Sequence, residues 1–181
     1  MSASVETNLE NLLTEKRNFR HLIGEITWFG LGWPAMGYFL SIFAIKLNAT
    51  PLELGLLSAL PAVFMLLASA LAPWWRRRYP DSRRALLWPT LANRLRPLLY
   101  ALVPFLPPAW QIAALLVIVS VGAIPVGIAN VVFLVLLREA VSDSRLTALV
   151  SQRMVALNLS LGLSTLAMGL WLERTPYPCN Y

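Results

Sequence analysis

Residues 109–137, AWQIAALLVIVSVGAIPVGIANVVFLVLL, form an apolar run without a single charged side chain. A helix needs about 20 apolar residues to cross the hydrocarbon core of a bilayer, and this run is longer than that. A strand of a membrane barrel would instead alternate polar and apolar side chains over short segments. The run therefore predicts a transmembrane helix, with Gly122, Pro125 and Gly127 near its middle.

The composition of the whole chain points to the same class of protein. Of the 181 residues, 57% are hydrophobic and only 13% are charged. A soluble domain could not cover so much apolar surface with so few charges, and a disordered chain would be polar and poor in aromatic residues. The single cysteine, Cys179, excludes a disulfide-stapled secreted scaffold. We therefore expect an all-α integral membrane protein, with the lipid bilayer as its first partner.

Four more apolar runs accompany the first one. The sequence predicts five transmembrane helices, at about residues 23–45, 54–75, 85–106, 109–137 and 154–172. Residues 23–172 are thus expected to form a bundle, preceded by a cytoplasmic amphipathic arm (1–22) and followed by an extracytoplasmic tail (173–181). Between the helices, residues 138–153 are expected to form a polar loop. Thr50, Pro51 and Glu53 match the pattern of a capped helix start.

The basic residues are distributed unevenly between the two ends of these helices. The N-terminal arm and the loops after the second and fourth spans are expected on one side of the membrane, and together they contain eleven Lys and Arg residues. The connections on the opposite side contain two. Cytoplasmic loops of membrane proteins are enriched in Lys and Arg. The distribution therefore predicts a multi-pass protein of the plasma (inner) membrane with a cytoplasmic N-terminus. It also explains the net charge of +6 without nucleic acid as a partner.

Arg94 and Arg96 lie inside the predicted third span. At about 1.5 Å of rise per residue, Arg94 lies roughly 15 Å into that span, near mid-bilayer, where a charge is costly. This depth favours a place for Arg94 on a substrate path, where it binds an anionic or polar group or a carboxylate. About 200° separate the two side chains on a helix, so both cannot face one cavity. Alternatively, the third span begins later in the sequence, and both arginines have no role in transport because their side chains reach back to the cytoplasm.

Five further residues are candidates for a substrate path. Glu25 is a membrane carboxylate that could relay protons, or an interfacial, solvated acid. Asn130 and Asn158 could line the path or join helices through hydrogen bonds. Trp33 and Tyr38 could form an aromatic wall for the solute, or pack within the bundle. No metal site is expected, because one His and one Cys cannot build one. Nor does the sequence contain a motif that indicates an enzyme or a cofactor.

Together these features resemble the N-terminal half of a major facilitator superfamily transporter. The likeness rests on a Gly-bearing, aromatic first span entered from a cytoplasmic arm, and on residues 52–61, LELGLLSALP, at the opening of helix two. It also rests on the short basic loop after that helix and on Asp143, Arg145 and Arg153 before the last span. The resemblance covers helices one to five and implies a truncated bacterial member that stops before helix six.

In this family, two helical bundles rock around a central site. The resemblance therefore implies secondary active transport of a small solute, with a proton or other ion as coupling partner and a missing C-terminal bundle. It also implies a cytoplasmic gating loop made of Arg76, Arg77, Arg78, Asp81, Arg83 and Arg84. This loop departs from the family pattern, because no acid precedes its basic run.

Two other functions compete with transport. Five helices without the second bundle are not expected to move solute. A small membrane adaptor or assembly subunit is the main alternative, and it would bind another membrane protein through Gly- and Ser-rich helix faces. An intramembrane enzyme acting on lipid would need Asp, His or Ser clustered at one depth, and the sequence offers no such cluster.

Overall fold

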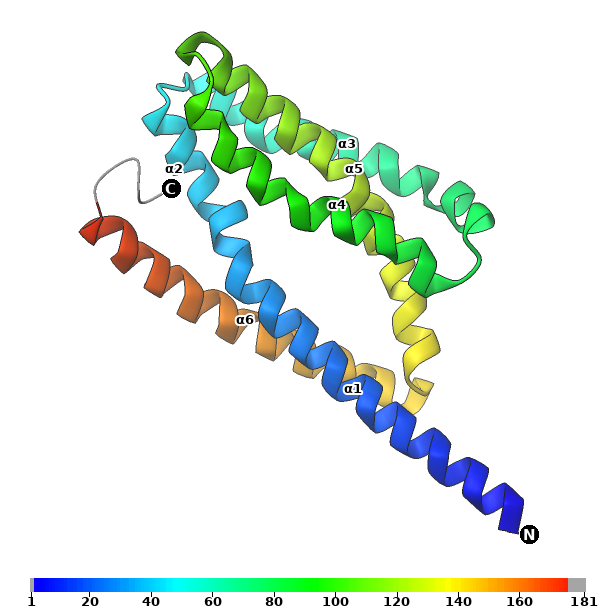
Figure 1. Ribbon diagram of the computed structural model, residues 1–181. Helices are drawn as coiled ribbons and strands as arrows, with labels where there is room; N and C mark the ends of the chain where they lie inside the picture. The colour runs from blue at the N-terminus through cyan, green and yellow to red at the C-terminus, as the bar shows by residue number, and fades with distance from the viewer. Residues whose placement is uncertain (1, 176–181) are drawn as a thin grey trace. The chain divides into compact units, whose positions relative to one another are not determined.

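The computed structural model describes residues 2–175 of the chain, with side chains for residue 10 and residues 12–175. This part is helical and contains no strand. In chain order the elements are α1 (Ser2–Met36), α2 (Tyr38–Lys46), α3 (Pro51–Arg78), α4 (Ser82–Leu102), the 3-10 helix η1 (Val103–Phe105), α5 (Pro108–Ala140) and α6 (Asp143–Arg174) (Figure 1). The all-α prediction is confirmed. Most of the predicted tail, including Cys179, lies outside the described residues.

Four helical stretches of the described chain are long and apolar enough to cross a membrane. They are Leu12–Lys46, Pro51–Arg78, Pro108–Ala140 and Asp143–Arg174. Their presence supports a multi-pass membrane protein. The predicted third span coincides with α4 and η1. It is not among the four, since the middle of α4 carries Asn93, Arg94 and Arg96. The count of five spans therefore stays a prediction.

The helix boundaries depart from the predicted ones near both ends of the chain. The predicted arm and the first span form one continuous helix, α1, and the span is interrupted only at Gly37, before α2. The prediction of a loop over residues 138–153 is wrong, because α5 continues to Ala140 and α6 begins at Asp143. This stretch is polar but contains neither Gly nor Pro. Polar side chains alone do not end a helix, since they leave the backbone hydrogen bonds intact.

The predicted capped start at Thr50 is confirmed, and the structure shows a second cap at Asp81 that the sequence analysis did not predict. The Thr50 hydroxyl accepts a hydrogen bond from the backbone N–H of Glu53, and the Glu53 carboxylate accepts one from the backbone N–H of Thr50 at 2.7 Å. Pro51 occupies the first turn of α3. At the start of α4, the Asp81 carboxylate accepts from the backbone N–H of Arg83 at 2.9 Å. Each cap satisfies an N–H group that has no partner within its helix.

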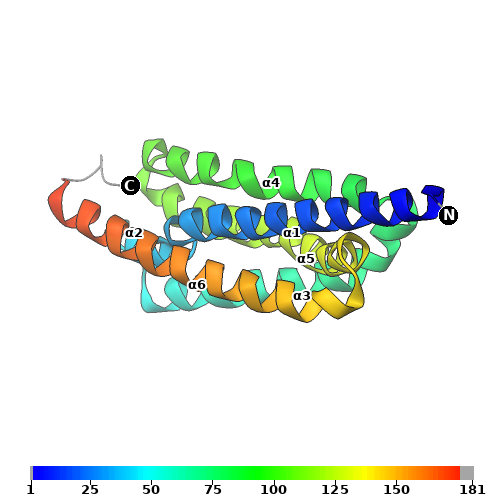
Figure 2. The ribbon, with the colours of Figure 1, turned by 90° about the horizontal axis from the view of Figure 1, so that it is seen from below.

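The chain divides into two compact units. The first contains α1 up to Ala35 and the chain from Leu137 through α6, and the second runs from Met36 to Leu136. In the first unit, α1 and α6 lie side by side (Figures 1 and 2).

The two helices of the first unit run in the same direction. The Asn18 amide donates to the carbonyl oxygen of Ala140 at 3.1 Å, near the start of the pair. Further along both helices, the Ser164 hydroxyl donates to the carbonyl oxygen of Leu31. Between these points, buried Gly30 faces Ser160, whose hydroxyl oxygen occupies the place that a side chain at residue 30 would need. The contacts advance together along both helices, so the packing is parallel.

In the second unit, α3, α4 and α5 pack together, and each runs opposite to the one before it in the chain (Figure 1). Two apolar clusters mark the ends of this three-helix group. One includes Leu57 of α3, Val103 of η1 and Leu115 of α5; the other includes Ala85 of α4 and Val132 of α5, with Trp75 of α3 packed against it. Residue numbers rise from the first cluster to the second on α3 and α5, and fall on α4. The less apolar α4 therefore runs antiparallel to both neighbours over the same length.

The helices α3 and α5 approach each other closely at Gly127. A Cβ atom at this residue would lie 2.5 Å from the carbonyl oxygen of Met65 and 2.9 Å from the Cβ atom of Ala68. The Ser69 hydroxyl lies 3.4 Å from the carbonyl oxygen of Gly127. Small residues of this kind allow helix backbones to touch in a membrane, where packing and hydrogen bonds drive association.

We expect Gly127→Ala to destabilise the protein by about 1–3 kcal/mol, because the backbone of Met65 must move to admit the methyl group. Unfolding in detergent, followed by denaturant titration, measures this difference. Gly55→Ala on α3 is the matched control, since a Cβ atom there meets nothing within 4 Å. Equal stability of the two variants would contradict the close packing at Gly127.

Candidate functional site

The most unusual side chain of the second unit is Arg96, which is only 8% exposed. Its Nη1 atom donates to the carbonyl oxygen of Gly122 on α5 at 3.4 Å, and its guanidinium carbon lies 5.9 Å from the centroid of the Tyr100 ring. A Cβ atom at Gly122 would lie 2.5 Å from Cδ of Arg96. The missing side chain of Gly122 thus creates the space that the stem of Arg96 occupies.

The Arg96 guanidinium has fewer partners than its charge requires. Its Nε atom is buried without a hydrogen-bond partner, as is Oδ1 of Asn93 on the same helix. Within the described chain Arg96 forms no ion pair. Gly122 stands near the middle of an uncharged run, so the expected depth of this cation is near the centre of the membrane. An unpaired charge in apolar surroundings is costly, and a polar or anionic ligand would lower that cost.

Arg94, on the same helix, is exposed where Arg96 is buried. Its side chain is exposed, and it lines a shallow hollow of about 350 Å³ together with Arg83, Thr90 and apolar residues of α4. The prediction that the two arginines face different ways is confirmed. The sequence favours Arg94 for the interior position, whereas the structure brings Arg96 there. The deciding feature is Gly122, which lies 26 residues away in sequence and cannot be paired with Arg96 from the pattern alone.

In the first unit, Glu25 and Arg153 form an ion pair between α1 and α6. Arg153 is 7% exposed, and its Nη2 atom lies 3.1 Å from Oε2 of Glu25, whose side chain is 40% exposed. The Nη1 atom of Arg153 donates to the carbonyl oxygen of Leu22. One guanidinium therefore bonds a side chain and the backbone of α1. This geometry assigns Glu25 a part in joining the two helices, a role that the sequence did not indicate.

The other candidates of the first unit do not gather around this pair. Asn158 is exposed on α6, and its amide donates to the carbonyl oxygen of Met154 in the same helix at 2.8 Å. Trp33 is half-buried and packs against Phe29, with ring centroids 5.2 Å apart. The structure therefore gives Asn158 a partner within its own helix and Trp33 a packing contact.

The other candidates of the second unit are exposed as well. Asn130 lies on α5, with its amide nitrogen 3.9 Å from the sulfur of Met65. Tyr38, the first residue of α2, is 55% exposed. Neither residue has a described contact with Arg96, so the buried polar site of this unit consists of Arg96 and Asn93.

The predicted gating loop is a tight connection between α3 and α4. Arg76 donates to the buried Ser82 hydroxyl at 2.9 Å, which ties the end of α3 to the start of α4. Asp81 caps α4 and lies 3.9 Å from Nε of Arg84. Three other arginines of the loop are exposed, namely Arg77, Arg78 and Arg83. The turn is thus held locally by its own polar groups.

No cluster of three or more His, Cys, Asp or Glu side chains in the described chain could hold a metal ion.

No protein-family model, curated protein or solved structure matches the sequence.

We expect Arg153→Gln to destabilise the packing of α1 on α6 by about 1–3 kcal/mol, because the guanidinium bonds both Glu25 and the backbone. Glu25→Gln should cost less, about 1 kcal/mol or below, since its carboxylate is partly exposed. Denaturant unfolding in detergent measures both effects. Arg174→Gln, at the exposed end of α6, removes the same charge and serves as the control. A loss for Arg153→Gln no greater than that for Arg174→Gln would contradict the assignment.

Proposed function

We propose that the chain forms part of a secondary transporter that moves a small polar solute across the membrane by alternating access. The observation that carries this proposal is Arg96, a buried cation without a counter-ion in the described chain. Ionisable residues inside membrane helices are rare, and they commonly mark substrate and ion paths. A protein that used α4 only as an anchor would gain nothing from this charge.

Arg96 and Asn93 are the groups that would meet the solute. The unsatisfied Nε–H of Arg96 is a donor, and the unsatisfied Oδ1 of Asn93 is an acceptor. A solute with a negatively charged or polar group would complete the hydrogen bonds that the protein leaves open. A proton or other ion gradient would supply the energy.

The parallel pairing of α1 and α6 supports five membrane crossings rather than four. Two parallel helices cross the membrane in the same sense, so an odd number of crossings must connect them. The helices α3 and α5 alone would provide two, an even number. With α4 as a third crossing, antiparallel to both neighbours, the count becomes odd. This arrangement agrees with the resemblance to helices one to five of a major facilitator superfamily transporter, and we include that relationship in the proposal.

The test uses the gene at its native locus, so that every part of the protein is present. We expect a null strain and an Arg96→Gln strain to share the same defect in a panel of uptake and export assays with small organic anions, amino acids and sugars. The loss for Arg96→Gln should be about tenfold or more, since a hydrogen bond to a charged group is worth about 1.5–3 kcal/mol.

Arg94→Gln is the matched control, because it removes an equal charge from the exposed face of the same helix. Transport in this strain should remain near the wild-type rate. Immunoblots of the membrane fraction check that each variant accumulates. A null strain with unchanged transport of every solute, together with co-purification of another membrane protein, would favour the adaptor function instead.

A further inference from the structure

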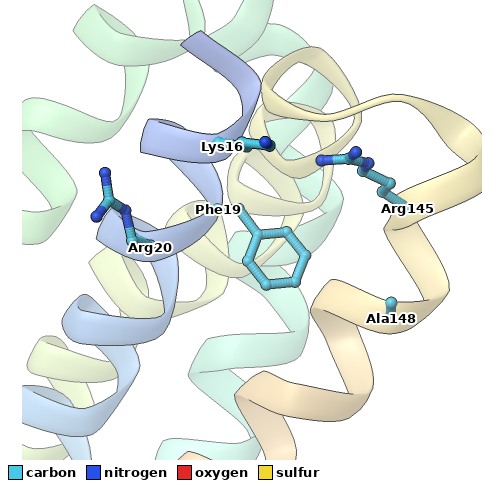
Figure 3. A pocket seen from close by; sticks show the side chains of 5 residues that line it. All are labelled: Lys16, Phe19, Arg20, Arg145 and Ala148. Atoms are coloured by element: carbon cyan, nitrogen blue, oxygen red, sulfur yellow. The ribbon is translucent and has the colours of Figure 1, made fainter. Parts of the chain in front are cut away.

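A second polar feature lies in the first unit, and none of the residues that line it belongs to the proposed transport path. An open hollow of about 600 Å³ is lined by Lys16, Phe19 and Arg20 of α1 and by Arg145 and Ala148 of α6. Lys16 and Arg145 point toward one another from the two helices, and the Phe19 ring lies between the helices (Figure 3). Three of these five side chains are cationic.

The hollow has more positive than negative charge. Arg145 has Nε 4.0 Å from Oε1 of Glu15. That carboxylate is already shared, because its Oε1 accepts from the backbone N–H of Ser142 at 2.9 Å and from the Ser142 hydroxyl at 2.7 Å. Lys16 and Arg20 form no ion pair within the described chain. Lys16 and Arg145 therefore face one engaged carboxylate, while the guanidinium of Arg20, which also lines the hollow, points away from them (Figure 3). The positive charge around the hollow exceeds the negative charge and favours an anion.

The cations of α1 lie at the depth of lipid headgroups. The apolar run of α1 begins near Ile23. At about 1.5 Å of rise per residue, Arg20 lies roughly 4 Å and Lys16 roughly 10 Å before it. The headgroup layer extends about 5–8 Å beyond the hydrocarbon core on each side. Long basic side chains at this level can reach a lipid phosphate.

An exposed apolar track leads from the hollow along α6. Val155, Leu159, Leu163 and Leu166 are each more than half exposed. They lie on the same face of the helix as Ala148, since their spacing follows the helical repeat. Val155 and Leu166 are separated by about 16 Å along the helix, close to half of the roughly 30 Å hydrocarbon core. The length of the track therefore matches the hydrocarbon thickness of one leaflet of the bilayer.

We propose that the hollow binds the phosphate group of an anionic lipid, whose acyl chains lie along the exposed face of α6. Basic pockets between membrane helices are suited to such headgroups. The shared chemistry is a phosphate ester, and the apolar track favours the lipid over a soluble phosphate compound. The bound lipid would join α1 to α6 at the end where Glu15 and Ser142 already connect them.

Native mass spectrometry of the full chain, titrated with phosphatidylglycerol or phosphatidylcholine, tests the proposal. Wild-type protein should retain phosphatidylglycerol preferentially. The triple variant Lys16→Gln/Arg20→Gln/Arg145→Gln should lose about tenfold or more of this retention. The control Arg17→Gln/Arg138→Gln/Arg174→Gln removes the same charge from exposed side chains outside the hollow, and it should stay within about twofold of wild type. Equal losses in both variants would show a net-charge effect and overturn the site.

Two additional measurements complete the test. If circular dichroism shows that the triple variant does not fold, the double variant Lys16→Gln/Arg20→Gln replaces it, since Arg145 then keeps its contact with Glu15. Glycerol 1-phosphate, which has the headgroup phosphate without acyl chains, should not displace phosphatidylglycerol at equal concentration. Equal competition would identify a soluble phosphate ester as the ligand and would overturn the assignment to lipid.

Discussion

Buried polar side chains of the long helices donate to backbone carbonyl oxygens of a neighbouring helix, and these bonds set the register of each helix pair. Ser164 bonds Leu31 and Arg153 bonds Leu22 in the first unit, while Arg96 bonds Gly122 in the second. In a membrane, lipid is as apolar as the helix faces, so apolar burial alone cannot select one register. A polar group that loses its partner in hydrocarbon is costly. The positions of a few polar residues therefore determine how the long apolar helices align.

Small residues make this arrangement possible. Gly30, Gly122 and Gly127 lie where a neighbouring side chain or backbone occupies the space of a Cβ atom. Gly55 has nothing within 4 Å, so its backbone is not needed for contact. A glycine in an apolar run therefore does not by itself indicate a close helix contact. Its structural role depends on which group of the neighbouring helix lies opposite. At Gly122 the opposing group is a charged side chain, and this pairing turns a packing contact into a candidate binding site.

Local sequence determines the helical class, the apolar spans and the helix starts at Thr50 and Asp81. The local pattern predicts the helical class, the apolar spans and the start at Thr50. It does not predict the start at Asp81. The local pattern did not reveal that most of residues 138–153, predicted as a loop, are helical. The polar residues suggest exposure to water, but exposure is compatible with helix, and Arg153 of this stretch is in fact buried against α1. Likewise the predicted roles of Arg94 and Glu25 follow from depth along one helix. The burial of Arg96 in place of Arg94 and the ion pair of Glu25 depend instead on a second helix far away in sequence.

By itself, the sequence determined that the chain is helical and apolar enough for a membrane, since hydropathy and capping act within one or two turns. Only the tertiary structure decided which arginine of α4 lies inside, that α1 and α6 run in parallel, and that Lys16, Arg20 and Arg145 share one hollow. These facts depend on pairs of residues that are 26 to more than 120 positions apart. The physical reason is that an apolar helix presents several faces to lipid or protein with nearly equal free energy. The partner that contains the matching glycine or carbonyl oxygen selects among them.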